Sequence, residues 1–345
     1  MKTMFQTISE RMRRGEDLVL VTVVASSGAT PRGAGARMLV GAEGRICGTI
    51  GGGAVEYRSE QIAADVLRAK ESREQSFTLA KNDVLDLGMI CGGDVEVFFH
   101  FLDAADKTVP ALAEAAEALF ASGKDLWLVS ELSSGGRLGL WSRETGFVGV
   151  GAPDALTEAM RRKPMRVEAD GRDFYVEQIQ SSGRVYVFGC GHVAQELVPV
   201  LAHVGFRCVA MDDRPEFARR ELFPDAEEVK LIDFHDIAAS VTVTEEDYIC
   251  VMTRSHAFDG VAQAFAMQTP ACYIGVIGSR RKIEGVRAKL KAEYGFADAE
   301  FERVTTPIGL PIRAETPAEI AISIAGQMIA LRAERSGREG RGTGK

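Results

Sequence analysis

The sequence predicts an α/β protein made of an N-terminal α+β domain followed by a doubly wound domain with a parallel sheet. From Gly183 onward, apolar strand-like runs alternate with helical patterns, as in a parallel sheet with right-handed crossovers. Before that point, strands and helices follow one another without regular alternation. The length of 345 residues also favours two domains, because one domain usually holds roughly 100–200 residues.

The boundary is expected at Ser181-Ser182-Gly183, just before the first strand of the regular pattern. We therefore expect the α+β domain at residues 1–182 and the doubly wound domain at residues 183–334. Residues 335–345 offer no apolar side chain to bury, so we expect a disordered tail there.

The individual elements follow from their hydrophobic patterns. In the first half we expect strands at 17–26, 45–50, 94–102 and 125–132, and helices at 54–70 and 110–123. In the second half we expect strands at 184–188, 206–212, 247–253 and 271–277, and a helix at 192–204. The last helix has the clearest start signal: Thr316 at the N-cap, Pro317 at the first helical position and Glu319 three residues after the cap form a capping box.

Composition excludes several classes of function. The net charge of −8 argues against a nucleic-acid partner, since such binding needs a field of Lys and Arg. No apolar run approaches the 18 or more residues of a membrane-spanning helix, and the start of the chain lacks the apolar core of a signal peptide. We therefore expect a cytoplasmic protein with no membrane partner.

The six cysteines are scattered without a C-x-x-C pair, so they predict neither a zinc knuckle nor a disulfide framework. Four of them fall in or beside strand-like runs, where buried, inert thiols are expected: Cys190, Cys208, Cys250 and Cys272. Cys91 differs because it lies in a turn just before Gly92-Gly93. An accessible thiolate there would be a soft ligand for a metal or a sulfur-bearing group, so Cys91 is the candidate metal ligand.

Residues 189–194 read Gly-Cys-Gly-His-Val-Ala, after a strand and at the start of a helix. They fit the G-x-G-x-x-A fingerprint of a Rossmann-like domain: Gly189 allows the tight turn, Gly191 lets the backbone approach a pyrophosphate, and Ala194 lets helix and strand pack closely. A phosphate would then bind the free N–H groups of the helix. His192 could either brace the turn or touch a substrate.

The next strand ends in Asp212 and Asp213, a little over 20 residues after Gly189. An acidic residue at this place binds the ribose 2′-hydroxyl in dinucleotide-binding domains, so Asp212 is the predicted ribose ligand, with a preference for an unphosphorylated ribose such as that of NAD. A surface acidic turn beside Arg214-Pro215 is the simpler alternative.

Two further turns should reach the same edge of the sheet. One carries Arg254, Ser255 and His256; the other carries Gly278, Ser279 and Arg280, followed by two more cations. The second suits an anionic ligand, although basic residues at a helix start can simply be solvated. His256 could serve as an acid or base, but no partner in a recognisable arrangement is evident.

The N-terminal half offers two more glycine-rich candidates for an anion cradle. One is the stretch 26–38, and the other runs from a strand into Gly51, Gly52 and Gly53 before a helix. Flexible hairpin loops would explain the same spacing equally well.

Taken together, these blocks resemble the xanthine dehydrogenase accessory factor family, also called XdhC/CoxI, over most of the chain. The matching stretches are TPRGAGARMLV, GTIGGGAVE, MICGGDVEVFF, VFGCGHVAQ, MDDRPEFA, TRSHAFDG, YIGVIGSRRK and the final PIGLPI and ETPAEIAISI. Two places depart from the family: Ala54 stands where the CoxI-like branch has a cysteine, and Pro311 and Arg313 replace residues of the usual P-I-G-L-D-I-G block.

The resemblance implies a maturation factor, more a non-catalytic chaperone than an enzyme. It would bind molybdenum cofactor, as molybdopterin or its dinucleotide, protect it while a cysteine desulfurase supplies its terminal sulfur, and deliver it to xanthine dehydrogenase or a related molybdenum hydroxylase. It also implies a homodimer. The Rossmann turn would bind the phosphate end of the cofactor while Cys91 or a glycine-rich loop approaches the metal.

Two other functions compete with this one. An NAD-dependent oxidoreductase would use Gly189, Gly191, Ala194 and Asp212, with His256 as its catalytic candidate. A pure interaction scaffold would bind no small molecule tightly.

Overall fold

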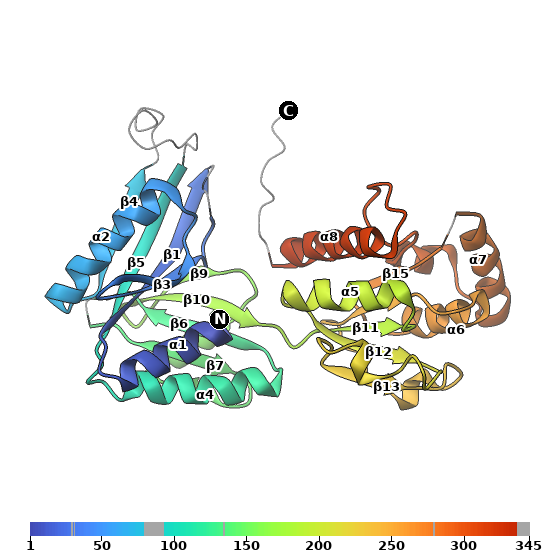
Figure 1. Cartoon of the computed structure of the whole chain (residues 1–345), viewed down its shortest axis with the longest axis horizontal. Coiled ribbons are helices and arrows are strands. Elements are labelled where there is room, and N and C mark those ends of the chain that lie inside the picture. Colours follow the sequence, from blue (N-terminus) through green and yellow to red (C-terminus); the bar gives the residue numbers. More distant parts are fainter. Residues whose placement is uncertain (29, 31, 79–92, 134, 279, 337–345) are drawn as a thin grey trace. The chain divides into compact units, whose positions relative to one another are not determined.

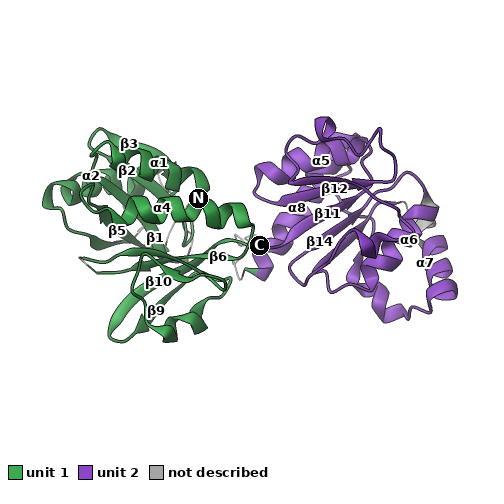
Figure 2. Cartoon of the chain, turned by 90° about the horizontal axis from the view of Figure 1, so that it is seen from below, with its two compact units in different colours: residues 1–181, 336–345 green, residues 182–335 purple. Residues whose placement is uncertain are grey.

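The computed structural model describes residues 1–28, 30, 32–78, 93–133, 135–278 and 280–336. The chain divides into two compact units, Met1–Ser181 and Ser182–Arg335, shown in green and purple in Figure 2. Each unit is described by itself below.

The N-terminal unit contains two antiparallel sheets of five strands each. The first has the order β3-β2-β1-β5-β4 and consists of β3 (Gly44–Thr49), β2 (Arg37–Gly41), β1 (Leu18–Gly28), β5 (Gly93–Leu102) and β4 (Arg73–Thr78). The second has the order β8-β7-β6-β10-β9 and consists of β8 (Gly146–Val148), β7 (Leu138–Ser142), β6 (Leu126–Glu131), β10 (Arg172–Gln180) and β9 (Met165–Ala169). The two sheets make this unit α+β, as the sequence predicts.

The helices of this unit bury the apolar faces of the sheets. Helix α2 (Gly53–Ala69) packs its Val55, Ala63 and Val66 against one face of the first sheet. Helices α1 (Lys2–Arg13) and α4 (Thr108–Ser122) pack together and share a core with leucines of both sheets. A short 3₁₀ helix, η2 (Asp154–Ala159), covers part of the second sheet.

The C-terminal unit is built on a six-stranded parallel sheet with the order β13-β12-β11-β14-β15-β16. Its strands are β11 (Arg184–Phe188), β12 (Arg207–Asp212), β13 (Glu228–Leu231), β14 (Tyr248–Val251), β15 (Tyr273–Val276) and β16 (Val304–Thr305). In chain order this is the 3-2-1-4-5-6 arrangement of a doubly wound dinucleotide-binding fold. The strand order reverses between β11 and β14, so this is the place where ligands bind in such folds.

Helices cover both faces of the parallel sheet (Figure 1). On one face α5 (His192–His203) and α8 (Pro317–Arg335) pack together over Val185, Val187 and Cys250. On the other face α6 (His256–Met267) packs against the sheet and contacts α7 (Arg280–Tyr294). Three 3₁₀ helices lie in the connections: η3 (Arg220–Leu222), η4 (Ile237–Ala239) and η5 (Asp298–Arg303).

The structure confirms the fold class and the elements expected from sequence. It adds α1, β2, β4, β7, β8, β9, β10, β13 and β16, which the patterns did not predict. The capping box at the start of α8 is confirmed: the Glu319 amide donates to Thr316 Oγ1 at 3.3 Å, and the Thr316 amide donates to Glu319 Oε2 at 2.9 Å.

Within the described ranges, no helix is long and apolar enough to cross a membrane. Most of the predicted tail, residues 337–345, lies outside the described part of the chain.

Candidate functional site

The carboxyl ends of β11, β12 and β14 meet at the strand switch point of the parallel sheet. Backbone hydrogen bonds join the turns that follow them: the Gly189 amide donates to Met211 O at 2.7 Å, and the Met252 amide donates to Phe188 O at 2.8 Å. The turns after β11, β12 and β14 therefore form one connected edge, which carries most of the candidate residues in the C-terminal unit.

The structure explains why glycine is needed at one of the two glycine positions of the turn after β11, but not at the other. Gly189 has φ +107°, and a Cβ there would lie 2.3 Å from Met252 O. The protein itself therefore requires Gly189. Gly191 has φ −72° and ψ −173°, which any residue adopts, and a Cβ there would meet no atom within 4 Å. Neither backbone conformation nor packing requires Gly191.

Asp212, the predicted ribose ligand, is hydrogen-bonded within the chain to the turn after β11 and to its own neighbour Arg214. It is 1% exposed, and its Oδ2 accepts the Cys190 amide at 2.8 Å. Its carboxylate also accepts the Arg214 amide at 3.1 Å and Nε and Nη2 of the Arg214 guanidinium at 2.8 and 3.0 Å. Burial alone would raise the pKa of Asp212, but the hydrogen bonds from Arg214 and Cys190 outweigh burial and hold the pKa below its ordinary value.

The other residues of this turn differ in burial and in hydrogen bonding. Ala194 is fully buried and lets α5 pack on the sheet, as its small size predicts. His192 is exposed, and its ring forms no hydrogen bond within the described part of the chain, so it does not brace the turn.

Cys190 is buried, and burial raises the pKa of its thiol to about 12. The expected burial is confirmed for Cys190, Cys208 and Cys250, and burial raises the pKa of each thiol, whereas Cys272 is only half-buried.

The turn after β14 is stabilised by its own polar side chains. Asp259 Oδ1 accepts the Thr253 amide at 2.9 Å and the Thr253 hydroxyl at 2.7 Å, and Ser255 caps α6 by accepting the Phe258 amide. His256 is the first residue of α6. Arg254 extends away from this turn and donates to Asp213 Oδ2 at 2.8 Å, which links the turn after β14 to the turn after β12.

The turn after β15 lies beside the turn after β14, because the Ile277 amide donates to Val251 O at 2.9 Å. Gly278 follows this strand, and Arg280 begins α7. Ser279 lies outside the described residues. The order of the strands therefore brings Gly278 and the start of α7 to the same edge as the Gly189 turn.

Sequence reasoning missed the residues that hold the loop before α8. Gln327 Oε1 accepts the Gly309 amide at 2.9 Å and the Tyr273 hydroxyl at 2.5 Å, and Ser323 donates to Leu310 O at 2.7 Å. Arg313, one of the departures from the family pattern, adopts φ +62° in this loop. The sequence feature that could have identified Gln327 is a polar residue on the apolar, buried face of the predicted last helix.

In the N-terminal unit, the glycine block at residues 51–53 encloses a carboxylate of the protein itself. Glu56 Oε2 accepts the amides of Ile50 at 2.9 Å and Gly52 at 3.1 Å, together with the Thr49 hydroxyl. The Gly51 amide donates to Thr49 Oγ1 at 3.1 Å. Burial alone would raise the pKa of Glu56, but the bonds from Thr49, Gly52 and Ile50 outweigh burial and lower it. The amides of Gly51 and Gly52 are therefore already bonded within the chain.

The other candidates of this unit are placed by strand register. Gly28, at the end of β1, pairs with Gly93, and Arg37 pairs with Thr49, so the connection from β1 to β2 and the block at 51–53 lie at the same end of the first sheet. Arg37 is buried in an ion pair with Glu177 of β10. Cys91, the candidate metal ligand, lies outside the described residues.

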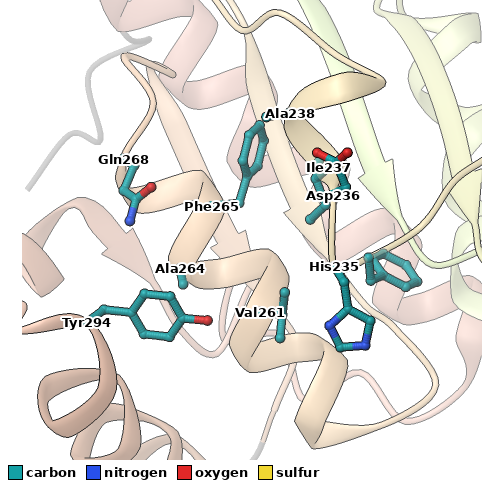
Figure 3. Close-up of a pocket in the computed structure, with 10 residues that line it drawn as sticks. His235, Asp236, Ile237, Ala238, Val261, Ala264, Phe265, Gln268 and Tyr294 are labelled. Atoms are coloured by element: carbon teal, nitrogen blue, oxygen red, sulfur yellow. The ribbon is translucent and has the colours of Figure 1, made fainter.

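A separate pocket of the C-terminal unit lies against α6 (Figure 3). His235 and Asp236 come from the loop after β13, Phe265 from α6, Gln268 from the position just after α6, and Tyr294 from the end of α7. None of the predicted site residues lines this pocket. In the described part of the chain, no group of three or more His, Cys, Asp or Glu side chains could hold a metal ion.

Two relatives and one solved structure resemble this chain over nearly its whole length, and their names refer to xanthine dehydrogenase or to insertion of molybdenum cofactor. The chain is 26% identical to a protein of Bacillus subtilis (strain 168) named as a probable xanthine dehydrogenase subunit, over 92% of this chain and 94% of the relative. It is 22% identical to the molybdenum cofactor insertion chaperone PaoD of Escherichia coli (strain K12), over 96% of this chain and 88% of the relative. A crystal structure of a protein from Bacillus halodurans described as a xanthine dehydrogenase shares the fold, with a TM-score of 0.76, 24% identity and coverage of 97% of this chain and 96% of that one.

Family profiles match both units. The profile described as the XdhC and CoxI family matches residues 12–78, and the profile described as the XdhC Rossmann domain matches residues 185–328. Together they span more than half of the chain, and they include the Gly51 to Gly53 block and the Gly189 turn. The chain belongs to the XdhC and CoxI family.

Proposed function

We propose that this protein is a maturation factor for a molybdenum hydroxylase of the xanthine dehydrogenase class. It binds molybdenum cofactor, protects it while its terminal sulfur is added, and delivers it to the apoenzyme. Family membership supports this role, as does similarity along nearly the whole chain to a relative named as a molybdenum cofactor insertion chaperone. Nothing in the comparisons supports NAD as a ligand, so an NAD-dependent oxidoreductase is not the function proposed.

The open space at Gly191 carries the proposal. Gly191 is the N-cap of α5, where no side chain caps the helix, and neither its backbone angles nor its surroundings require a glycine. A ligand that lies against the backbone provides the missing reason, since a Cβ would stand between it and the first amides of the helix. Phosphate is the group that such a helix start favours, and molybdenum cofactor carries one at the end away from the metal.

The thiol chemistry of the proposal is assigned to Cys91. Cys190 lies within the turn of residues 189–191, but its side chain is fully buried in the core of the C-terminal unit and is not accessible to a ligand. Cys91 lies outside the described residues, and its proposed role rests on its position before Gly92-Gly93 in a block typical of the family.

The proposal includes partners and a location. A cysteine desulfurase supplies the sulfur, a xanthine dehydrogenase-type apoenzyme receives the cofactor, and the chain acts as a homodimer in the cytoplasm. These follow from the resemblance to the family.

The test is cofactor retention. The wild-type chain and its Gly191→Ala variant are purified anaerobically from cells that make molybdenum cofactor, and molybdenum and released pterin are measured per chain. We expect near-stoichiometric cofactor in the wild type and a loss of about tenfold or more in the variant, because the Cβ occupies the space of the phosphate. Cys91→Ala should lose molybdenum while its far-UV circular dichroism stays unchanged.

Gly285→Ala is the matched control, since Gly285 is an exposed glycine of α7 that also has open space around its Cβ. It should retain the cofactor as the wild type does. Absence of molybdenum and pterin from the wild type, or equal retention in Gly191→Ala, contradicts the proposal.

A further inference from the structure

A dinucleotide on a doubly wound fold lies across the switch point, with one ribose at the end of the second strand and the pyrophosphate at the first helix. In this chain those places are the end of β12, with Asp212 and Asp213, and the start of α5. At the end of β12, Asp212 is bonded to Arg214 and Asp213 is bonded to Arg254. These two arginines limit the part of a ligand that this edge can accept.

Asp212 has no acceptor site left for a ribose hydroxyl. A carboxylate offers about four acceptor positions, and Asp212 accepts four hydrogen bonds: one from the Cys190 amide and three from Arg214. The Arg214 guanidinium binds both carboxylate oxygens, and it also lies over the Phe217 ring at 3.8 Å. A ribose would exchange these charge-assisted bonds for weaker bonds from neutral hydroxyls.

The pair between Arg254 and Asp213 spans the end of β11. Strands β12 and β14 flank β11, so the turns that hold these two residues start about 10 Å apart, twice the spacing of neighbouring strands. Arg254 Nη2 reaches Asp213 Oδ2 at 2.8 Å, and its guanidinium lies 5.1 Å from the centre of the Phe258 ring. The remaining oxygen, Asp213 Oδ1, is buried. In the described part of the chain, Asp213 Oδ2 is thus bonded to Arg254, while Asp213 Oδ1 has no hydrogen-bond partner and is shielded from solvent.

The phosphate end of the edge remains open. Gly191 has no atom within 4 Å of its Cβ position, and no side chain caps α5. The same edge thus combines an open helix start with a closed position for a ribose.

Given the proposed function, we propose that this unit binds a terminal phosphate and excludes a nucleoside joined to it. The Asp212–Arg214 and Asp213–Arg254 pairs occupy the position of the nucleoside. The ligand is therefore the cofactor form that ends in a single phosphate, and neither its dinucleotide form nor NAD is accepted.

The experiment titrates NAD and ADP-ribose into the full-length chain, purified without molybdenum cofactor, by isothermal titration calorimetry. The wild type should show no saturable binding below about 1 mM, whereas Arg214→Ala and Arg254→Ala should each bind ADP-ribose about tenfold more tightly or better. Arg219→Ala removes an exposed arginine of the same loop and should behave as the wild type.

Arg214→Ala leaves the buried Asp212 without its main partner, so its folding is checked by circular dichroism. Arg254→Ala keeps the test open if Arg214→Ala unfolds, because the Arg254 side chain is 44% exposed and its partner Asp213 is 18% exposed, against 1% for Asp212. Micromolar binding of either ligand to the wild type overturns the inference, and so does the absence of any gain in a folded variant.

Mass spectrometry of the ligand released from the wild type gives an independent result. A cofactor ending in one phosphate supports the inference, and a cofactor dinucleotide overturns it while leaving the proposed function intact. Because the titrations use no molybdenum cofactor, their outcome is separate from that of the retention test.

Discussion

Two glycine-rich turns join a strand to a helix in this chain, at residues 51–53 and at residues 189–191, and the sequence presents both as anion cradles. In the first, Glu56 lies inside the turn and accepts the amides of Ile50 and Gly52. In the second, Asp212 accepts one amide of the turn, that of Cys190, and the start of α5 has no side-chain cap. The comparison teaches that the amides of a glycine-rich turn are open to an external anion only where no side chain of the protein already accepts them.

The largest effect is expected for Gly189→Ala, which separates the two glycines of the second turn. The positive φ and the contact with Met252 O should destabilise the C-terminal unit by about 3 kcal/mol. Gly191→Ala should cost about 1 kcal/mol or less, because only the N-cap preference opposes it.

Urea denaturation followed by two signals measures this difference. Both tryptophans, Trp127 and Trp141, belong to the N-terminal unit, so their fluorescence reports that unit alone. Circular dichroism follows both units. Gly189→Ala should lower the urea midpoint of the dichroism transition of the C-terminal unit and leave the tryptophan fluorescence transition unchanged. Equal stability of Gly189→Ala and Gly191→Ala would contradict the difference that we assign to the two glycines.

Glu56→Gln addresses the first turn. The variant loses charge-assisted bonds to Ile50, Gly52 and Arg45, which should destabilise the N-terminal unit by about 2 kcal/mol. Glu60→Gln is the matched control, since Glu60 also pairs with Arg45 at 3.4 Å but is 32% exposed, and it should change stability by less than about 0.5 kcal/mol. Tryptophan fluorescence in urea measures both, and similar losses in the two variants would show that Glu56 does not hold the turn.

A smaller effect is expected from pH. The folded-state pKa of Glu56 lies below its ordinary value of 4.5, so its contribution is present above that value and is lost as pH falls through the folded pKa. The stability difference between the wild type and Glu56→Gln should therefore shrink when urea denaturation is repeated between pH 7 and about pH 3. A difference that does not change over this range would mean that the carboxylate charge contributes nothing.

Much of the fold could be predicted because its signals are local. Alternating apolar strands and helices predicted the parallel sheet, and Thr316 and Glu319 predicted the start of α8 from residues three positions apart. The edge strand β13 and the two-residue β16 were missed, since such short strands carry little hydrophobic pattern of their own. Gln327 was missed because its partners, Gly309 and Tyr273, are distant in the sequence.

The sequence by itself determined the type of each turn: where glycines follow a strand, where a helix starts and which acidic residues stand near. Only the tertiary structure decided which amides in these turns remain available to a ligand. Glu56 fills the first turn, and the pair between Arg254 and Asp213 joins residues 41 positions apart across the end of β11. The physical reason is that a hydrogen-bonding group can be satisfied by any partner the fold brings within about 3 Å, and sequence spacing does not reveal that partner.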